Sequence, residues 1–189
     1  MKLQKLLSLT RQAIDEYGMI QENDKIAVGI SGGKDSLTLL YALSCLRKFY
    51  PHKFDIVAVT VDLGFDNLNL DGIRKFCKER DVEYHVIKTQ IAEVVFHIRE
   101  ESNPCSLCAK MRKGALNDAV KELGCNKVAY AHHKDDLLES MMMSFLFEGR
   151  IHTFAPVTYL DRSGITVIRP LLFLYEGDRS EEHTSELQS

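Results

Sequence analysis

Short apolar, β-branched runs alternate with helix-patterned segments along most of this chain. The strand-like runs cover residues 25–30, 54–61, 83–88, 127–131 and 166–168, and the helix-like segments cover 36–49, 68–80, 105–123 and 135–147. Strands that alternate with helices pair in parallel, because each helix carries the chain back to the edge where the next strand begins. The alternation predicts an α/β fold with an open, doubly wound parallel sheet of about five strands and helices on both faces.

The loop after the first strand is the strongest candidate for a ligand site, because ligands of such sheets bind beyond the carboxyl ends of the strands. Its sequence is SGGKDS, residues 31–36, and it runs directly into a helix. Adjacent glycines allow a tight turn that brings N–H groups close to an anion, while the serine hydroxyls and the lysine add donors and positive charge. The spacing is not that of a Walker A loop.

We interpret this loop as a nucleotide-phosphate site, and the alternative is a Gly-Ser turn without a ligand. The expected binding residues are Ser31, Gly32, Gly33, Lys34, Asp35 and Ser36, and we also expect Lys34 to act in catalysis.

Polar residues also follow the second, fourth and fifth strands of the predicted sheet, the last being Arg169, and their convergence on one edge favours a site. Asp62 ends the second strand, where it is expected to contact the ribose or adenine of a nucleotide. After the fourth strand, we expect His132 to contact the nucleotide, and Asp135 and Asp136 to orient Mg²⁺ or a substrate base as catalytic residues. The alternative for either aspartate is a helix cap, since Asp is favoured at helix N-termini.

A Cys-x-x-Cys pair, Cys105 and Cys108, opens the helix-like segment at 105–123. A helix start and nearby cations favour the thiolate form, which suits metal ligation or sulfur transfer. Two thiolates do not complete a zinc site or an iron–sulfur cluster, so zinc, cluster and persulfide chemistry all stay open. The alternative is an incidental or thioredoxin-like pair. Cys45, Cys77 and Cys125 are expected to be structural.

Apolar residues and net charge narrow the class of protein. No apolar run reaches membrane-spanning length, and the first twenty residues are patterned as an amphipathic helix rather than a signal peptide, so we expect a cytoplasmic protein without membrane association. The net charge of −3 gives no support for a nucleic-acid partner.

The apolar cluster Met141, Met142, Met143, Phe145, Leu146 and Phe147 is expected to lie in the core.

The last segment, RSEEHTSELQS at residues 179–189, matches the translation of a widely used sequencing-adaptor stem. We therefore expect one domain over residues 1–178, cut short near its C-terminal end, followed by a non-native tail over 179–189.

Four segments of the chain together resemble the tRNA 2-thiocytidine synthetase family, which belongs to the PP-loop ATP pyrophosphatases. They are SGGKDS, HIREESNPCSLCAKMRKGAL, AHHKDD and FEGRIHTFAPVTYLDRSGITVIRPL. The resemblance extends to Gly177 and implies a Rossmann-like HUP fold (adenine nucleotide alpha hydrolase-like). It also implies ATP, Mg²⁺ and a [4Fe-4S] cluster held by three cysteines. Cys105 and Cys108 match the first two ligands, and the third would lie beyond Gly177.

The activity implied by this resemblance is ATP-dependent transfer of sulfur to cytidine 32 in the tRNA anticodon loop. The C2 oxygen would be adenylated and then replaced by sulfur delivered through Cys105 and Cys108, as a cluster or a persulfide. The implied partners are tRNA and a sulfur donor such as a cysteine desulfurase, and a homodimer is a further expectation. Expected RNA contacts are His97, Arg99, Arg112, Lys113 and Arg150, for which a solvated helix face is the alternative.

Two other functions stay open. The first is a PP-loop adenylating enzyme with another acceptor, either a different tRNA base or a small metabolite. The second is a nucleotide-binding or iron–sulfur module without turnover. The Cys-x-x-Cys pair argues against a ligase that uses an amine, since such an enzyme needs no thiols.

Overall fold

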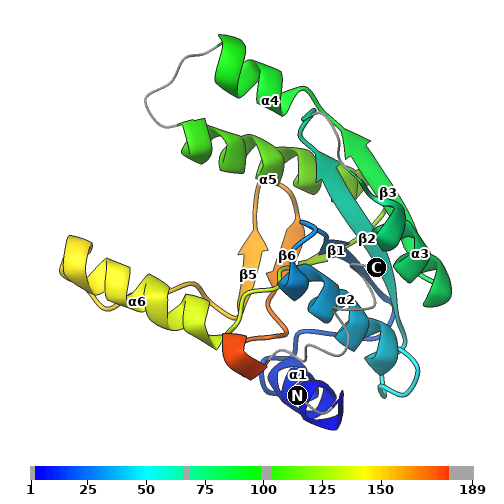
Figure 1. Ribbon diagram of the computed structural model, residues 1–189. Helices are drawn as coiled ribbons and strands as arrows, with labels where there is room; N and C mark the ends of the chain where they lie inside the picture. Colours follow the sequence, from blue (N-terminus) through cyan, green and yellow to red (C-terminus); the bar gives the residue numbers. More distant parts are fainter. Residues whose placement is uncertain (1–2, 66–68, 99–103, 179–189) are drawn as a thin grey trace.

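A computed structural model describes residues 3–65, 69–98 and 104–178 of the chain (Figure 1). Its strands are β1 (Asp24–Gly29), β2 (Phe54–Asp62), β3 (Glu83–Lys88), β4 (Lys127–Ala129), β5 (Val157–Leu160) and β6 (Ile165–Ile168). Its helices are α1 (Leu3–Glu16), α2 (Lys34–Leu46), α3 (Asp71–Glu79), α4 (Ile91–Glu93), α5 (Pro104–Glu122) and α6 (Lys134–Glu148), with a π-helical turn at Val94–Ile98 and a 3-10 turn at Glu176–Asp178. The tail expected at 179–189 lies outside the described residues.

The strands form one sheet in the order β3-β2-β1-β4-β6-β5. Central strand β1 pairs in parallel with β2 and β4, so that Ala27 lies between Val57 and Val128. The α/β fold and the parallel core are therefore confirmed. The expected number of strands was too low, because β5 joins the edge of the sheet through an antiparallel hairpin with β6.

Helices cover both faces of this sheet, as expected for a doubly wound fold (Figure 1). On one face, α1, α2 and α3 pack over alternate strand residues such as Ile26, Val28 and Ile56. On the other face, α5 packs through Leu116, Ala119 and Val120 over the intervening residues of the same strands. Successive side chains of a strand point to opposite faces of the sheet, so the apolar side chains are divided between two cores.

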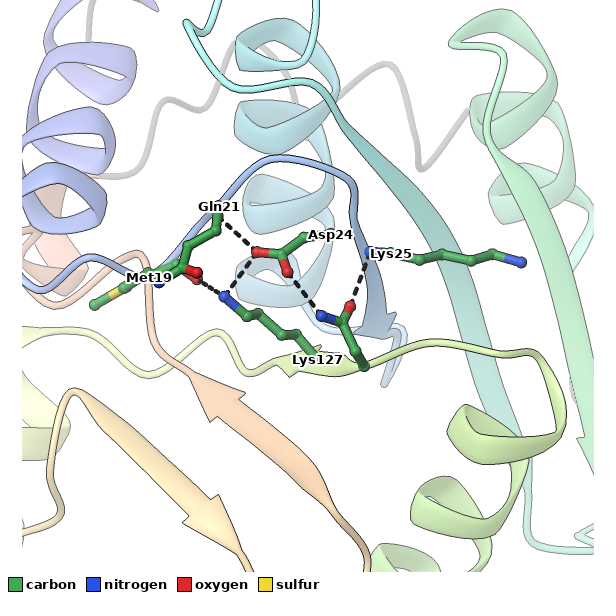
Figure 2. Close-up of polar contacts among 6 residues, drawn as sticks. Met19, Gln21, Asp24, Lys25 and Lys127 are labelled. Carbon is green, nitrogen blue, oxygen red and sulfur yellow. Dashed lines mark hydrogen bonds and ion pairs between the residues drawn. The ribbon is translucent and has the colours of Figure 1, made fainter.

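The edge of the sheet where β1 and β4 begin is fixed by a buried ion pair (Figure 2). Lys127 Nζ lies 2.7 Å from Asp24 Oδ2 and donates a second hydrogen bond to the Met19 carbonyl. Asp24 also accepts hydrogen bonds from the Gln21 N–H and the Asn126 side chain, so its carboxylate is well satisfied. This network lies at the opposite end of the strands from the predicted site.

Helix α6 departs from its expected environment. The expectation that its methionine and phenylalanine cluster lies in the core was wrong, because the helix extends away from the sheet and Ser144 is the residue of α6 that is buried (Figure 1). Phe147 is 77% exposed and Leu146 is 65% exposed, and Met142, Met143 and Phe145 are exposed as well.

No helix in the described part of the chain is long and apolar enough to cross a membrane.

Candidate nucleotide and acceptor site

The SGGKDS loop connects β1 to α2 and is tied together by its own serines. The Ile30 N–H donates to the Val59 carbonyl, which continues the sheet by one residue, and Gly32 then turns the chain with φ of +82°. Buried Ser36 Oγ donates to the Gly33 carbonyl at 2.8 Å and accepts from the Ser31 N–H at 3.3 Å. The loop is therefore preformed, with the start of a 13-residue helix directly behind it.

A cavity of about 650 Å³ lies beside this loop, at the carboxyl edge of the parallel strands. A cavity of this size is in the range that holds small ligands and cofactors. It is lined from the ends of four strands and from one side of α5. The polar residues in its wall are Ser31, Asp35, Ser36, Thr60, Asp62, Arg112, Lys113, Tyr130, His132, Asp136 and Arg169.

Of the six loop residues expected to bind phosphate, Ser31, Asp35 and Ser36 line this cavity. Gly32, Gly33 and Lys34 belong to the same turn but form no part of its wall, and Lys34 is exposed.

Asp62 lines the cavity from the end of β2, as its strand-end position predicts. Its Oδ1 accepts a hydrogen bond from the Gly64 N–H at 2.9 Å, which closes a short turn. Gly64 has φ of +86°, and a Cβ at this position would lie 2.8 Å from the Thr89 carbonyl oxygen. The turn that presents Asp62 therefore depends on glycine.

Some of the polar residues at 132–136, after β4, cap helix α6, and some line the cavity. Asp136 is the third residue of α6 and accepts a hydrogen bond from the His133 N–H at 2.7 Å, so it caps the helix from within while lining the cavity. The N-cap position itself is held by His133 rather than by an aspartate. Asp135 accepts a hydrogen bond from the Glu176 N–H and does not line the cavity.

His132 faces the cavity from the same segment. Its ring packs between Tyr130, at a centroid distance of 5.9 Å, and Phe154, at 4.9 Å. Burial lowers the pKa of His132, and the positive charge of Arg169 lowers it further. The imidazole is therefore neutral near pH 7.

Helix α5 carries the cysteine pair at its start and two basic residues further along, and of these four residues Arg112 and Lys113 line the cavity while Cys105 and Cys108 do not. Its first turn holds Cys105, which is exposed, and Cys108, which is half-buried. Arg112 and Lys113 follow along the helix and line the cavity itself, beside the nucleotide loop. Among the described residues, no group of three or more His, Cys, Asp or Glu side chains is placed to hold a metal ion.

The three other cysteines lie away from this helix start, as expected for structural residues. Cys77 and Cys125 are buried, and burial raises the pKa of both thiols. Cys45 is half-buried within α2.

Of the remaining expected RNA contacts, Arg150 does not line the cavity. Arg150 is exposed after α6 and forms an ion pair with Glu148 at 2.7 Å. His97 belongs to the π-helical turn, and Arg99 lies outside the described residues.

Two further residues line the cavity: Tyr130, which had no expected role, and Arg169, which was expected only as a polar residue at the strand-end edge. Both follow strands, β4 and β6, and this position is the signal that marks them in the sequence. Arg169 Nη1 donates to the Ala155 carbonyl at 2.6 Å and to Thr158 Oγ1 at 3.3 Å, and its guanidinium lies over the Phe154 ring at 4.9 Å. Burial lowers the pKa of Arg169, yet an arginine stays charged at neutral pH.

This fold and this cavity together define an α/β nucleotide-binding protein whose site is at the carboxyl edge of its sheet. The sequence matches the PP-loop domain family over residues 3–181. Curated relatives named tRNA-cytidine(32) 2-sulfurtransferase include one from Geobacter sulfurreducens, 37% identical over 93% of this chain and 68% of its own length. Another, from Pseudomonas syringae pv. syringae, is 38% identical over 94% of this chain and 65% of its own length. The chain thus belongs to the PP-loop family and, within it, to the tRNA-cytidine(32) 2-sulfurtransferases.

Solved structures share the fold. The U34-tRNA thiolase NcsA from Methanococcus maripaludis, solved with its [4Fe-4S] cluster, has a TM-score of 0.74 and 27% identity, over 98% of this chain and 62% of the thiolase. The NH3-dependent NAD synthetase from Campylobacter jejuni has a TM-score of 0.56 and 21% identity, over 94% of this chain and 70% of the synthetase, and shares the fold alone. The chain spans about two thirds of the length of the curated relatives it matches.

Proposed function

We propose that this protein is an ATP-dependent tRNA sulfurtransferase that converts cytidine 32 of the anticodon loop to 2-thiocytidine. The observation that carries the proposal is the identity of 37–39% to enzymes of that name over most of the chain. The cavity supports it, since its wall includes a preformed phosphate loop and part of α5, the helix that carries the cysteine pair at its start, although neither cysteine lines the cavity. A ligase that activates a carboxylate for amine attack would have no use for these thiols.

The first step is adenylation of the base. The C2 oxygen of cytosine attacks the α-phosphorus of ATP, the bond to the β-phosphate breaks, and pyrophosphate leaves. The N–H groups of the SGGKDS loop and the positive charge of Lys34 stabilise negative charge on the phosphates, which is the main contribution such a site makes. Mg²⁺ adds charge to the same phosphates when bound, and the carboxylates of Asp35 and Asp136 are oxygen ligands of the kind it prefers.

The second step replaces oxygen by sulfur. A persulfide on Cys105, formed with sulfur from the desulfurase, attacks C2 through its outer sulfur, the C2–O bond breaks, and AMP leaves with that oxygen. The Cys108 thiolate then attacks the Cys105 sulfur, the S–S bond to the transferred sulfur breaks to release 2-thiocytidine, and a thiol reductant reduces the Cys105–Cys108 disulfide that results. The two cysteines supply two thiolates of a [4Fe-4S] cluster, but the described residues offer no third ligand beside them, so no step is assigned to a cluster here. A cysteine desulfurase is the proposed source of sulfur, and the homodimer and the cytoplasmic location stay predictions.

The test is a nucleoside assay. The protein is incubated with unmodified tRNA, ATP, Mg²⁺, cysteine, a cysteine desulfurase and a thiol reductant, and 2-thiocytidine is measured by mass spectrometry after digestion. We expect 2-thiocytidine at position 32 with the wild type and none with Cys105→Ala, while Cys45→Ala serves as the matched control and leaves its yield unchanged. ATP/pyrophosphate exchange that depends on tRNA should persist in Cys105→Ala. Normal 2-thiocytidine formation by Cys105→Ala would refute the role of the cysteine pair.

A further inference from the structure

The cavity has two ends, one on either side of the phosphate loop. Strand order places β2 on one side of β1 and places β4 and β6 on the other. Asp62 therefore lines one end, while Tyr130, His132 and Arg169 line the other. With ATP phosphates at the loop and its nucleoside toward Asp62, the end lined by Arg169 is left for the acceptor.

Arg169 is held there without a negatively charged partner. No ion pair joins it to a carboxylate among residues 3–65, 69–98 and 104–178. The two hydrogen bonds that its side chain donates to described residues both start from Nη1, and Nε is buried with no partner. A half-buried cation with unused donors costs free energy, and a ligand that supplies the missing acceptors removes part of that cost.

The plane of the guanidinium is fixed by its neighbours. Phe154 packs against one face, and the Ala155 carbonyl and Thr158 hydroxyl hold the Nη1 edge. Nε is out of reach of a ligand in the cavity because it is buried, so Nη2 is the nitrogen that is left to donate to two adjacent acceptors. Arginine N–H groups read paired acceptors of nucleic-acid bases.

Cytosine presents such a pair of acceptors, O2 and N3, on the ring that the proposed function modifies. Uracil presents O2 beside an N–H group, which would face an arginine donor without a hydrogen bond. The neutral ring of His132 and the ring of Tyr130 border the same end of the cavity, and aromatic side chains of this kind stack on unpaired RNA bases.

We infer that the end of the cavity lined by Tyr130, His132 and Arg169 is the acceptor-base subsite, and that Arg169 selects cytosine over uracil by donating to O2 and N3. The inference rests on the proposed function, because it assumes an RNA base as the acceptor. It makes Arg169 a specificity-determining residue that touches the substrate, with Phe154 as a positioning residue behind it.

The test compares two anticodon stem-loops that differ only in carrying cytidine or uridine at position 32. Their affinities are measured by fluorescence anisotropy with a non-hydrolysable ATP analogue present, so the readout needs no turnover. We expect the wild type to prefer cytidine and Arg169→Lys, which keeps the charge but loses the planar fork, to reduce that preference about 10-fold or more. The matched control is Arg162→Lys, an exposed arginine of the same hairpin, which should keep the preference.

Thermal unfolding, nucleotide affinity and crosslinking test the same subsite independently. Thermal unfolding of Arg169→Lys should match the wild type, and its affinity for the ATP analogue should be unchanged. A stem-loop with 5-bromocytidine at position 32 should photo-crosslink to Tyr130 or His132 in the wild type. The inference is overturned if Arg169→Lys keeps the full preference, if it loses affinity for the ATP analogue, or if crosslinks fall at the Asp62 end. Absence of 2-thiocytidine with normal crosslinking would instead refute the proposed function alone.

Discussion

Asp24 and Lys127 form an ion pair of 2.7 Å in which the two side chains are only 5% and 10% exposed. Each is the first residue of its strand, β1 and β4, and 97 residues of chain lie between Gly29 and Lys127. The pair therefore sets the register of the two strands whose other ends carry the nucleotide loop and His132. Burying both charges costs desolvation free energy, which offsets much of their attraction. The main effect of the pair is therefore that a fold in which Asp24 and Lys127 are buried apart would be much less stable.

Replacement of Asp24 by Asn should destabilise the fold by about 3 kcal/mol, because it leaves the Lys127 ammonium buried without its counter-charge. Urea unfolding followed by circular dichroism measures the change. Glu148→Gln is the matched control, since it removes the carboxylate of the exposed pair with Arg150 and should leave the urea midpoint unchanged. Equal midpoints for Asp24→Asn and the wild type would show that the pair does not stabilise the fold.

The same carboxylate predicts how stability depends on pH. Burial acts to raise the pKa of Asp24, but the hydrogen bonds from Lys127, the Gln21 N–H and Asn126 outweigh it and lower the pKa below its ordinary value. Because the pKa of Asp24 is lower in the folded protein, the unfolded chain takes up the proton at a higher pH than the folded protein does. The stabilisation by the Asp24 carboxylate is therefore complete above the ordinary carboxyl pKa, and it is lost as pH falls through the pKa of the folded protein. Unfolding free energies of the wild type and Asp24→Asn should therefore converge in acid. A gap that stays constant from pH 7 to pH 3 would contradict this.

The parts of the molecule that the sequence predicted correctly are those with local signals. The strand at residues 25–30 and the loop SGGKDS are specified by apolar runs, paired glycines and a following helix, and all of these act within a few residues. Strand β5 was missed because Val157–Leu160 is short and gains its partner only through the hairpin with β6. The roles of Tyr130 and Arg169 depend on the order β1-β4-β6, which is set by contacts far apart in sequence.

Gly64→Ala should weaken nucleotide binding and stability together. A side chain there would be strained at φ of +86° and would press on the Thr89 carbonyl, at an expected cost of about 1–3 kcal/mol, and it would displace the turn that holds Asp62. Gly114→Ala is the matched control, because it lies within α5 with open space around it and should stabilise the protein by about 1 kcal/mol. Urea midpoints and titration with an ATP analogue measure both effects. Unchanged affinity in Gly64→Ala would show that the turn does not position Asp62 for the nucleotide.

The cysteines should react with iodoacetamide in a defined order. Cys105 is exposed at the start of α5 and should be alkylated first, followed by the half-buried Cys108. Burial raises the pKa of the Cys77 thiol to about 11 and also raises that of Cys125, so both should resist alkylation at pH 8 in the folded protein. Peptide mass spectrometry after short pulses gives the order, and the same pulses in urea give the control in which all sites react. Early labelling of Cys77 in the folded protein would contradict the burial.

Truncation of the exposed apolar side chains of α6 should cost little stability, although the sequence alone suggested a core. Phe147 is 77% exposed, so Phe147→Ala removes few packing contacts and should change the free energy of unfolding by less than about 0.5 kcal/mol. Leu43→Ala provides the contrast, because Leu43 is fully buried between α2 and the sheet and should cost about 2–5 kcal/mol. Urea unfolding at several protein concentrations measures both variants. A stability loss for Phe147→Ala as large as that for Leu43→Ala would contradict the exposure of Phe147. If that loss grows with protein concentration, a second copy of the chain covers α6. If it does not depend on concentration, α6 is covered within the same chain.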